Sequence, residues 1–205
     1  MDRRVDRGQA TRQHLIAVAT QLFATRGYDG TSIEAVLEQA GVSRGSLYHH
    51  FASKERLFEA VVESVHTQVG EATLQAAAAV GDADAHTLLT TGYLAWVRLA
   101  GDPVVRRILL IDAPTVLGWR RWRQMEEQYG LGMLKDVLKA AAAEGRLAPE
   151  LIEPFSHMLL ATGNELALLI ALADDVPAAQ ASAEAAFDEF VTRLLQPPDI
   201  KPASP

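Results

Sequence analysis

The sequence contains no cysteine among its 205 residues. Disulfide bonds, thiolate zinc sites and cysteine nucleophiles are therefore excluded, and a reducing compartment is compatible with the composition. No apolar run approaches the roughly 18 residues that a membrane-spanning helix needs. The first fifteen residues also lack the apolar stretch of a signal peptide. We therefore expect a soluble, cytoplasmic protein that does not enter a membrane.

Positive charge is in deficit over the whole chain, whose formal net charge is −7. The deficit is unevenly distributed. Residues 1–56 carry eight Lys and Arg against six Asp and Glu, whereas residues 57–205 carry eleven against twenty. Because DNA repels an acidic surface and attracts a basic one, the N-terminal part is the one expected to approach phosphate.

Alternating strand patterns are missing, and nearly every segment shows the helical period instead. The first helix carries an apolar stripe, and Gly27 is placed to end it. Thr31 and Glu34 have capping-box spacing and predict the start of a second helix, which Gly41 ends. The stripe of the first helix consists of Leu15, Ile16, Ala19, Leu22 and Phe23.

A third, very short helix is expected between Ser43, which is placed to cap it, and His50. Ser53 is placed to cap a fourth, longer helix. Residues 41–55 read GVSRGSLYHHFASKE. Two short helices, a turn with glycine and small or polar residues on the first turn of the second helix are the requirements of a helix-turn-helix. Leu47 and Phe51 would anchor that second helix.

The first turn of this recognition helix faces outward in the predicted arrangement. Arg44 matches guanine O6 and N7 and is the candidate for direct base readout. Gly45 permits a close approach to the groove, and Ser46 can bond to a base or a phosphate. The complete predicted DNA-binding set is Thr31, Ser43, Arg44, Gly45, Ser46, Tyr48, His49 and Lys54.

The other members of this set are predicted to contact phosphates, through long polar side chains or through helix N-termini. Two alternatives stay open. Tyr48 could pack into the core, and Lys54 with Glu55 could be an ordinary solvated start of a helix.

The segment Leu15 to Leu57, and residues 41–51 above all, resembles the TetR family of bacterial regulators. The resemblance implies a homodimer that binds a palindromic, double-stranded DNA operator through residues 31–54, usually as a repressor. It also implies that the protein releases DNA when a small-molecule effector enters the C-terminal domain. Neither a cofactor nor enzymatic activity is implied.

The expected fold is all-α, with a three-helix DNA-binding domain followed by a larger helical domain for ligand binding and dimerisation. The expected boundaries are residues 1–55, residues 56–196 and a disordered tail at 197–205. Two apolar helices, at about 149–173 and 178–195, would pack against their copies in a second subunit. The alternative is that both helices only close the core of their own domain.

An effector pocket would be apolar with a few polar groups. The aromatic and polar residues of the larger domain supply candidates, although Trp and Met at helical spacing are more often core than pocket. The predicted effector-binding set is Tyr93, Trp96, Trp122, Met125, Tyr129, His157, Asn164 and Glu165.

Three other classes of function are less consistent with the sequence. Residues 41–45 match the G-x-S-x-G pattern of a hydrolase nucleophile, but that pattern requires a preceding strand, and the preceding residues predict a helix. A metal site is not expected, because His66, His86 and His157 lack ligand spacing. A helical adaptor would leave the recognition helix unexplained.

Overall fold

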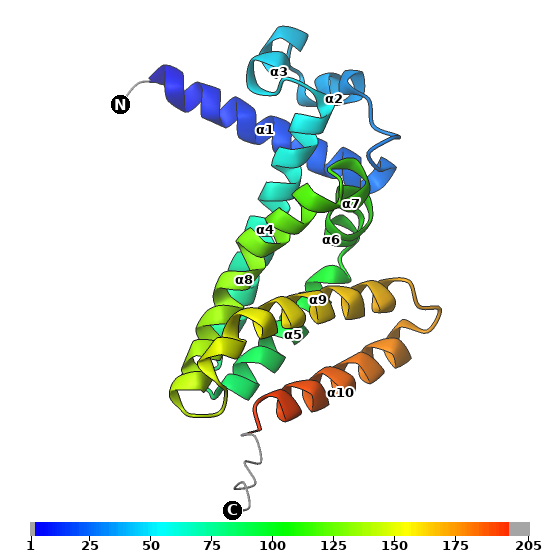
Figure 1. Cartoon of the computed structure of the whole chain (residues 1–205). Helices are drawn as coiled ribbons and strands as arrows, with labels where there is room; N and C mark the ends of the chain where they lie inside the picture. The colour runs from blue at the N-terminus through cyan, green and yellow to red at the C-terminus, as the bar shows by residue number, and fades with distance from the viewer. Residues whose placement is uncertain (1–2, 197–205) are drawn as a thin grey trace, which may run out of the picture. The chain divides into compact units, whose positions relative to one another are not determined.

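A computed structural model describes residues 3–196 of the chain, and the side chains of residues 8–196. Every regular element in this range is helical, which confirms the predicted fold class (Figure 1). None of the described helices is long and apolar enough to cross a membrane. The tail expected at 197–205 lies outside the described residues. The elements are α1 (Arg3–Arg26), α2 (Ile33–Ala40), α3 (Arg44–His50), α4 (Lys54–Ala79), α5 (Ala85–Ala100), α6 (Pro103–Val105), η1 (Arg106–Asp112), α7 (Ala113–Val116), α8 (Trp119–Ala143), η2 (Pro149–Leu151), α9 (Ile152–Ala171) and α10 (Val176–Leu194).

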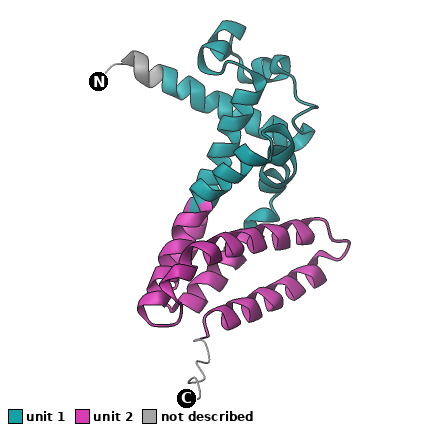
Figure 2. Ribbon diagram, viewed as in Figure 1, with its two compact units in different colours: residues 1–70, 99–129 teal, residues 71–98, 130–205 magenta. Residues whose placement is uncertain are grey.

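The chain divides into two compact units, which Figure 2 shows in different colours. Unit 1 comprises residues 1–70 and 99–129, and unit 2 comprises residues 71–98 and 130–205. Helices α4 and α8 each contribute to both units. The compact units therefore do not divide the chain at residue 55. The boundary expected there stays a prediction about which residues bind DNA and which bind the effector.

Unit 1 holds the three N-terminal helices on a shared apolar core. Leu15 and Phe23 of α1 and Leu47 of α3 are fully buried. Phe58 of α4 completes the core, with its ring centroid 5.1 Å from that of Phe23 and 5.0 Å from that of Tyr28. Rings at such separations gain more than their buried area alone provides. The core thus fixes α3 to α1 through side chains that face away from solvent.

Two glycines end helices where the sequence predicted. Gly27 follows α1 with φ 71° and Gly41 follows α2 with φ 65°, conformations that residues with a Cβ rarely adopt. The start of α2 differs from the prediction. Ser32 is the N-cap and accepts a hydrogen bond from the backbone N–H of Ala35 at 3.1 Å. Thr31, the predicted cap, lies one residue too early and is buried.

The segment from Pro103 to Val116 is helical although it contains Pro114, a residue that usually breaks a helix. The chain stays helical through a π-helix, η1, and continues into α7. In the wider π turn, the N–H of Ala113 bonds to the carbonyl of Ile108, five residues earlier. Pro114, which has no N–H, would leave the next carbonyl, that of Leu109, without this bond. The indole N–H of Trp122 donates to that carbonyl at 3.1 Å instead.

Unit 2 has its own core, in which helices α5, α8, α9 and α10 all bury side chains. The ring of Tyr93 on α5 stacks on that of Phe187 on α10, with centroids 3.9 Å apart. Gly130 of α8 makes room for Leu160 of α9. A Cβ at Gly130 would lie 2.7 Å from Leu160 Cδ1, closer than two carbon atoms can pack.

Candidate DNA-binding surface

Helix α3 supplies the exposed surface that the sequence predicted. Ser43 caps it, accepting a hydrogen bond from the N–H of Ser46 at 3.2 Å. Leu47 is fully buried and Phe51, which follows the helix, is 4% exposed. These two side chains anchor α3, which Figure 1 shows at the end of the chain's N-terminal part, next to α2. Arg44 and Gly45 are both exposed there.

Arg44 does not stand alone on this surface. Its guanidinium forms an ion pair with the carboxylate of Glu34 on α2, and both side chains are more than half exposed. A hydrogen bond from the backbone N–H of Glu34 itself, and then the bond from Arg44, lower the pKa of this carboxyl. Exposed ion pairs contribute little to stability, because water and salt screen the charges. The pair therefore holds Arg44 across the first turns of α2 and α3 without immobilising it strongly.

Gly45 has open space where a side chain would begin. A Cβ placed on it would meet nothing closer than Ser43 Oγ, at 4.0 Å. Folding therefore does not require glycine at this position. In a helix interior glycine is less stable than alanine by roughly 0.5–1 kcal/mol, so its presence is unfavourable for folding.

The aromatic and histidine residues of α3 face different ways. Tyr48 is 44% exposed, so the alternative that it packs into the core is wrong. His49 is exposed and its ring meets that of His50 edge to face at 5.1 Å. Burial lowers the pKa of His50, and the nearby charges of His49 and Arg12 lower it further. Tyr48 and His49 thus remain the residues of this helix with reach toward a phosphate.

Lys54 begins α4, where Ser53 accepts a hydrogen bond from the N–H of Arg56 at 3.2 Å. The Lys54 ammonium lies 4.0 Å from the centroid of the Tyr28 ring, a cation–π contact. Its side chain is half-buried rather than extended freely into solvent. The ring thus positions the charge at the N-terminus of α4.

Thr31 does not belong to this surface. It is 1% exposed, and its hydroxyl donates to the carbonyls of Gly27 at 2.8 Å and Leu22 at 3.2 Å. A hydroxyl bonded inside the protein cannot reach a phosphate, so we remove Thr31 from the predicted contacts. Both Thr31 and Ser32 are good capping residues, and the sequence alone favoured the wrong one of the two.

Two family models match the chain. The model described as "Bacterial regulatory proteins, tetR family" covers residues 15–61, and the model described as "Tetracyclin repressor-like, C-terminal domain" covers residues 86–194. The chain belongs to the TetR family. Members of this family are DNA-binding transcriptional regulators rather than enzymes.

Among curated TetR relatives, the chain is 40% identical over 67 residues to the HTH-type transcriptional regulator AcrR of Shigella flexneri, covering 33% of this chain and 31% of that protein. It is 41% identical over 59 residues to the HTH-type transcriptional repressor KstR2 of Mycobacterium tuberculosis, covering 29% and 30%. The matches thus span about a third of the length of these relatives.

Solved TetR structures resemble nearly the whole chain. A TetR-family regulator from Pectobacterium atrosepticum superposes with a TM-score of 0.79 at 27% identity, covering 95% of this chain and 98% of that one. RolR in complex with resorcinol gives a TM-score of 0.70 at 20% identity, covering 93% and 90%. The second likeness concerns the fold alone.

The strand that a G-x-S-x-G nucleophile requires is absent from residues 3–196, where helix α2 precedes Ser43. The Ser43 hydroxyl caps α3 instead. Within the described residues, no group of three or more His, Asp or Glu side chains is placed to hold a metal ion.

The predicted effector residues do not gather in one unit. Trp122, Met125 and Tyr129 lie in unit 1, and the other five lie in unit 2. Trp122 and Met125 are buried in the core, and the Trp122 indole is bonded to Leu109 as described above. Tyr129 stacks on the ring of His66, with centroids 5.2 Å apart and planes 4° from parallel.

In unit 2 the predicted residues also separate. Trp96 donates its indole N–H to the carbonyl of Gly163 at 3.1 Å, next to the half-buried Asn164. His157 Nε2 lies 3.2 Å from the Glu153 carboxylate. Glu165 is exposed on α9. Tyr93 is the member of the set that lines a cavity of unit 2.

Unit 1 also contains a buried polar pair that the sequence did not predict. His66 of α4 is 6% exposed and Glu126 of α8 is 3% exposed, with His66 Nε2 3.7 Å from Glu126 Oε1. Burial lowers the pKa of His66 to about 4, so the imidazole is neutral at neutral pH and the contact is not an ion pair. The two residues are sixty positions apart, so no local pattern in the sequence could have revealed the contact.

Proposed function

We propose that this TetR-family protein is a repressor that binds a palindromic operator as a homodimer and releases it when a small molecule binds. In this proposal residues 1–55 read DNA, and residues 56–196 dimerise and respond to the effector. The observation that carries the proposal is the exposed first turn of α3. Arg44 and Gly45 are exposed there and Ser46 is half-buried, and packing does not require glycine at position 45.

Direct readout is assigned to Arg44, because a guanidinium can donate two parallel hydrogen bonds to guanine in the major groove. Its ion pair with Glu34 is exposed and weak, so a guanine can replace the carboxylate. Ser46, Tyr48 and His49 lie within reach of the backbone around the same groove. Lys54 supplies a positive charge at the start of α4, where the helix dipole also favours a phosphate.

Dimerisation is supported by an apolar stripe on α9. Met158, Leu169 and Leu172 are 47%, 56% and 68% exposed, and their spacing places them on one face of the helix. A monomer rarely leaves such a stripe open to water. A two-fold four-helix interface formed with α10 would cover this stripe.

Effector binding is supported by the buried polar groups of unit 1. His66 Nε2 is buried and forms no hydrogen bond in the described part of the chain. An unsatisfied buried polar atom costs roughly 1–3 kcal/mol, and a ligand that forms a hydrogen bond with it would remove that cost. Glu126 and Tyr129 lie beside it, so an effector could bond to three different side chains. RolR, solved with resorcinol, shows that the fold can hold a small molecule.

A route from effector to DNA is supported by Asp112 at the end of η1. Its carboxylate accepts a hydrogen bond from the N–H of Tyr28 at 2.9 Å, in the loop between α1 and α2. Arg107 holds the same carboxylate at 3.1 Å. Gly27 lies directly against Arg107, since a Cβ there would be 2.0 Å from Arg107 Nη2. Any shift of the segment from Arg106 to Asp112 would therefore displace the loop that leads into α2.

The proposal is tested by selecting bound sequences from a random pool of double-stranded DNA with the full chain. The expected product is a palindrome whose half-sites lie about 34–36 Å apart, one helical turn of DNA. A pool without enrichment, or an enriched site without two-fold symmetry, would contradict operator binding by a dimer.

The role of Arg44 is tested with the selected operator. Arg44→Ala should relax base preference at one position of each half-site and weaken binding by roughly 1–3 kcal/mol. Lys139→Ala is the matched control, because Lys139 on α8 is also exposed and also paired with a carboxylate, that of Asp136. Equal losses in the two variants would show that only general charge is involved.

A further inference from the structure

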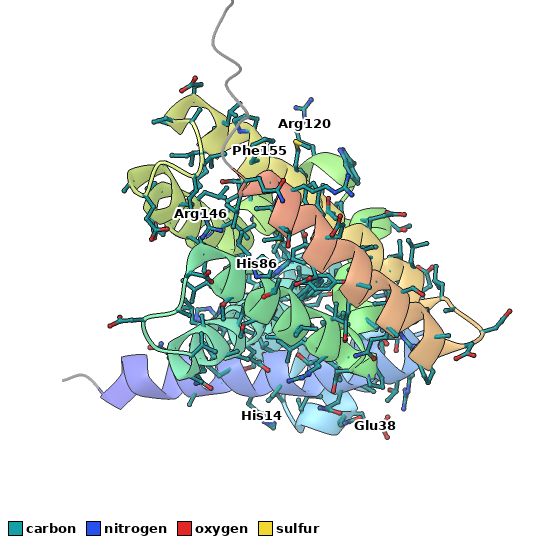
Figure 3. The ribbon with its side chains drawn as sticks, turned by 90° about the horizontal axis from the view of Figure 1, so that it is seen from below. His14, Glu38, His86, Arg120, Arg146 and Phe155 are labelled. Atoms are coloured by element: carbon teal, nitrogen blue, oxygen red, sulfur yellow. The ribbon has the colours of Figure 1, made fainter. Side chains whose placement is uncertain are left out.

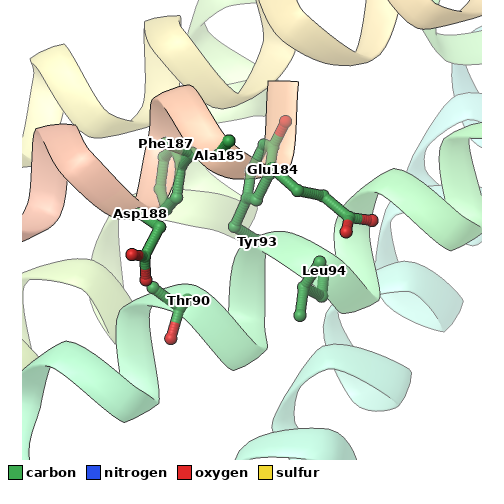
Figure 4. Close-up of a pocket in the computed structure, with 7 residues that line it drawn as sticks. All are labelled: Thr90, Tyr93, Leu94, Glu184, Ala185, Phe187 and Asp188. Carbon is green, nitrogen blue, oxygen red and sulfur yellow. The ribbon is translucent and has the colours of Figure 1, made fainter. Parts of the chain in front are cut away.

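Unit 2 contains a cavity of about 300 Å³ between α5 and α10 (Figure 4). It is distinct from the buried pair of His66 and Glu126 in unit 1. Operator binding, as proposed above, does not involve it. Its walls combine a hydroxyl, two rings, an aliphatic side chain and two carboxylates. Its lining includes Thr90, Tyr93 and Leu94 of α5 and Glu184, Phe187 and Asp188 of α10.

The charge of the cavity is negative. Glu184 and Asp188 lie one helical turn apart on α10, so their carboxylates are on the same side of the helix. Neither lysine nor arginine is among the lining residues. The Glu184 carboxylate accepts a hydrogen bond from the side-chain amide of Gln180 at 2.8 Å, and within residues 8–196 it has no cationic partner. The cavity thus presents a carboxylate that carries no compensating charge.

Asp188 has one neighbour that can carry charge. His86 of α5 lies beside α10 (Figure 3), with its Nε2 3.3 Å from Asp188 Oδ1 and 3.1 Å from Thr192 Oγ1. This imidazole is at one side of the aspartate, whose side chain remains 61% exposed. The second carboxylate oxygen is therefore available to another donor.

The inner wall of the cavity is apolar apart from one hydroxyl. Phe187 is 4% exposed and Leu94 packs against the same core. Tyr93 is 5% exposed, and its hydroxyl is buried without a hydrogen-bond partner among the described residues. Burial, with the charge of Glu184, raises the pKa of Tyr93 to about 12, so the hydroxyl keeps its proton. Tyr93 therefore adds no negative charge to the cavity wall.

We propose that the cavity between α5 and α10 binds a small organic cation, an amine with an apolar body. The ammonium group would lie between the carboxylates of Glu184 and Asp188, with the Thr90 hydroxyl as a further acceptor. The apolar body would lie along Leu94 and the edges of the two stacked rings. A bare metal ion would leave this apolar wall unused, and an anion would be repelled by both carboxylates.

The proposal is tested by isothermal titration calorimetry of the full chain without DNA, so the result does not depend on operator binding. The probes are 2-phenylethylamine, which is a cation at neutral pH, and two molecules of similar shape, the neutral 2-phenylethanol and the anion phenylacetate. The amine is expected to bind at least roughly tenfold more tightly than either, as a charge-assisted hydrogen bond requires. Equal affinities, or no binding of the amine, would overturn the proposal.

Variants locate the site. Glu184→Gln and Asp188→Asn keep the shape of each side chain, and each is expected to weaken amine binding roughly tenfold. Glu189→Gln is the matched control, because Glu189 is adjacent on α10 but does not line the cavity. An equal loss with Glu189→Gln would place the amine elsewhere and contradict the site. Circular dichroism melts verify folding, and the comparison of the three probes on the unaltered chain needs no variant.

Discussion

At the scale of single residues, the exposed surface of α3 carries residues that folding does not require. Leu47 and Phe51 hold the helix, whereas Arg44 and Gly45 contribute nothing to the core. Arg44 keeps an exposed partner, Glu34, that can be exchanged for DNA. Gly45 lowers helix stability without relieving any contact. Both residues are therefore better explained by an external partner than by packing.

Gly45 gives a prediction that separates folding from binding. Gly45→Ala should raise the free energy of unfolding by roughly 0.5–1 kcal/mol, because alanine favours the helix. The same change should weaken operator binding, since the added methyl group lies where the groove approaches. Chemical denaturation and fluorescence anisotropy with labelled operator measure the two quantities.

Gly132→Ala is the control for this change, because Gly132 is also helical, in α8, and also has open space around it. It should stabilise to a similar extent and leave DNA affinity unchanged. If Gly45→Ala binds DNA as well as the control does, the first turn of α3 does not lie close to a groove.

His66 gives a prediction about pH. Its pKa is about 4 when folded and 6.5 when unfolded, so the unfolded chain binds the extra proton first as the pH falls. The protein should therefore lose stability between pH 6.5 and pH 4, by on the order of 3 kcal/mol at about 1.4 kcal/mol per pKa unit. His66→Gln should flatten the dependence of unfolding free energy on pH in this window.

His157→Gln serves as the comparison for this experiment. His157 is partly exposed on α9 and faces Glu153 rather than the interior. An unaltered slope in His66→Gln would mean that His66 is not the group that titrates.

At the scale of elements, the helix ends were predictable and the tertiary contacts were not. Gly27, Gly41 and Ser43 act locally, through φ angles and cap hydrogen bonds, so their positions in the sequence were enough. Pro114 shows the limit of such local rules, because a π turn and an indole from another helix make up for its missing N–H. The cavity between α5 and α10 joins residues some ninety positions apart, and no periodicity connects them.

The indole of Trp122 gives a prediction at this scale. Trp122→Phe removes the donor to the Leu109 carbonyl and leaves that carbonyl buried and unpaired. The unfolding free energy should fall by about 1–3 kcal/mol. Trp119→Phe, at a position 68% exposed in the same helix, should change it little. Equal stability of both variants, measured by urea denaturation, would show that another group satisfies Leu109.

At the scale of the whole molecule, the stripe on α9 is the surface least suited to water. Its exposed leucines lie next to a buried face formed by Leu159 and Ile170. The helix is thus apolar over two adjoining sides, and the core of unit 2 covers one of them. The other side requires a second covering surface, which a twin subunit supplies in the proposed dimer.

Leu169 therefore gives the prediction for assembly. Leu169→Glu should convert the dimer to a monomer, because each interface would bury two uncompensated carboxylates. Analytical ultracentrifugation measures the change. Leu74→Glu on α4 is the control, since Leu74 is exposed to the same extent, 56%. A chain that is already monomeric, or that stays dimeric after Leu169→Glu, would place the interface elsewhere or nowhere.

The contact between Gly130 and Leu160 couples the substitutions that these two positions can accept. A methyl group gained at 130 would meet the end of the half-buried Leu160 side chain, which would have to turn away. A shorter side chain at 160 would remove that conflict, so in evolution a change at 160 would make a later change at 130 easier.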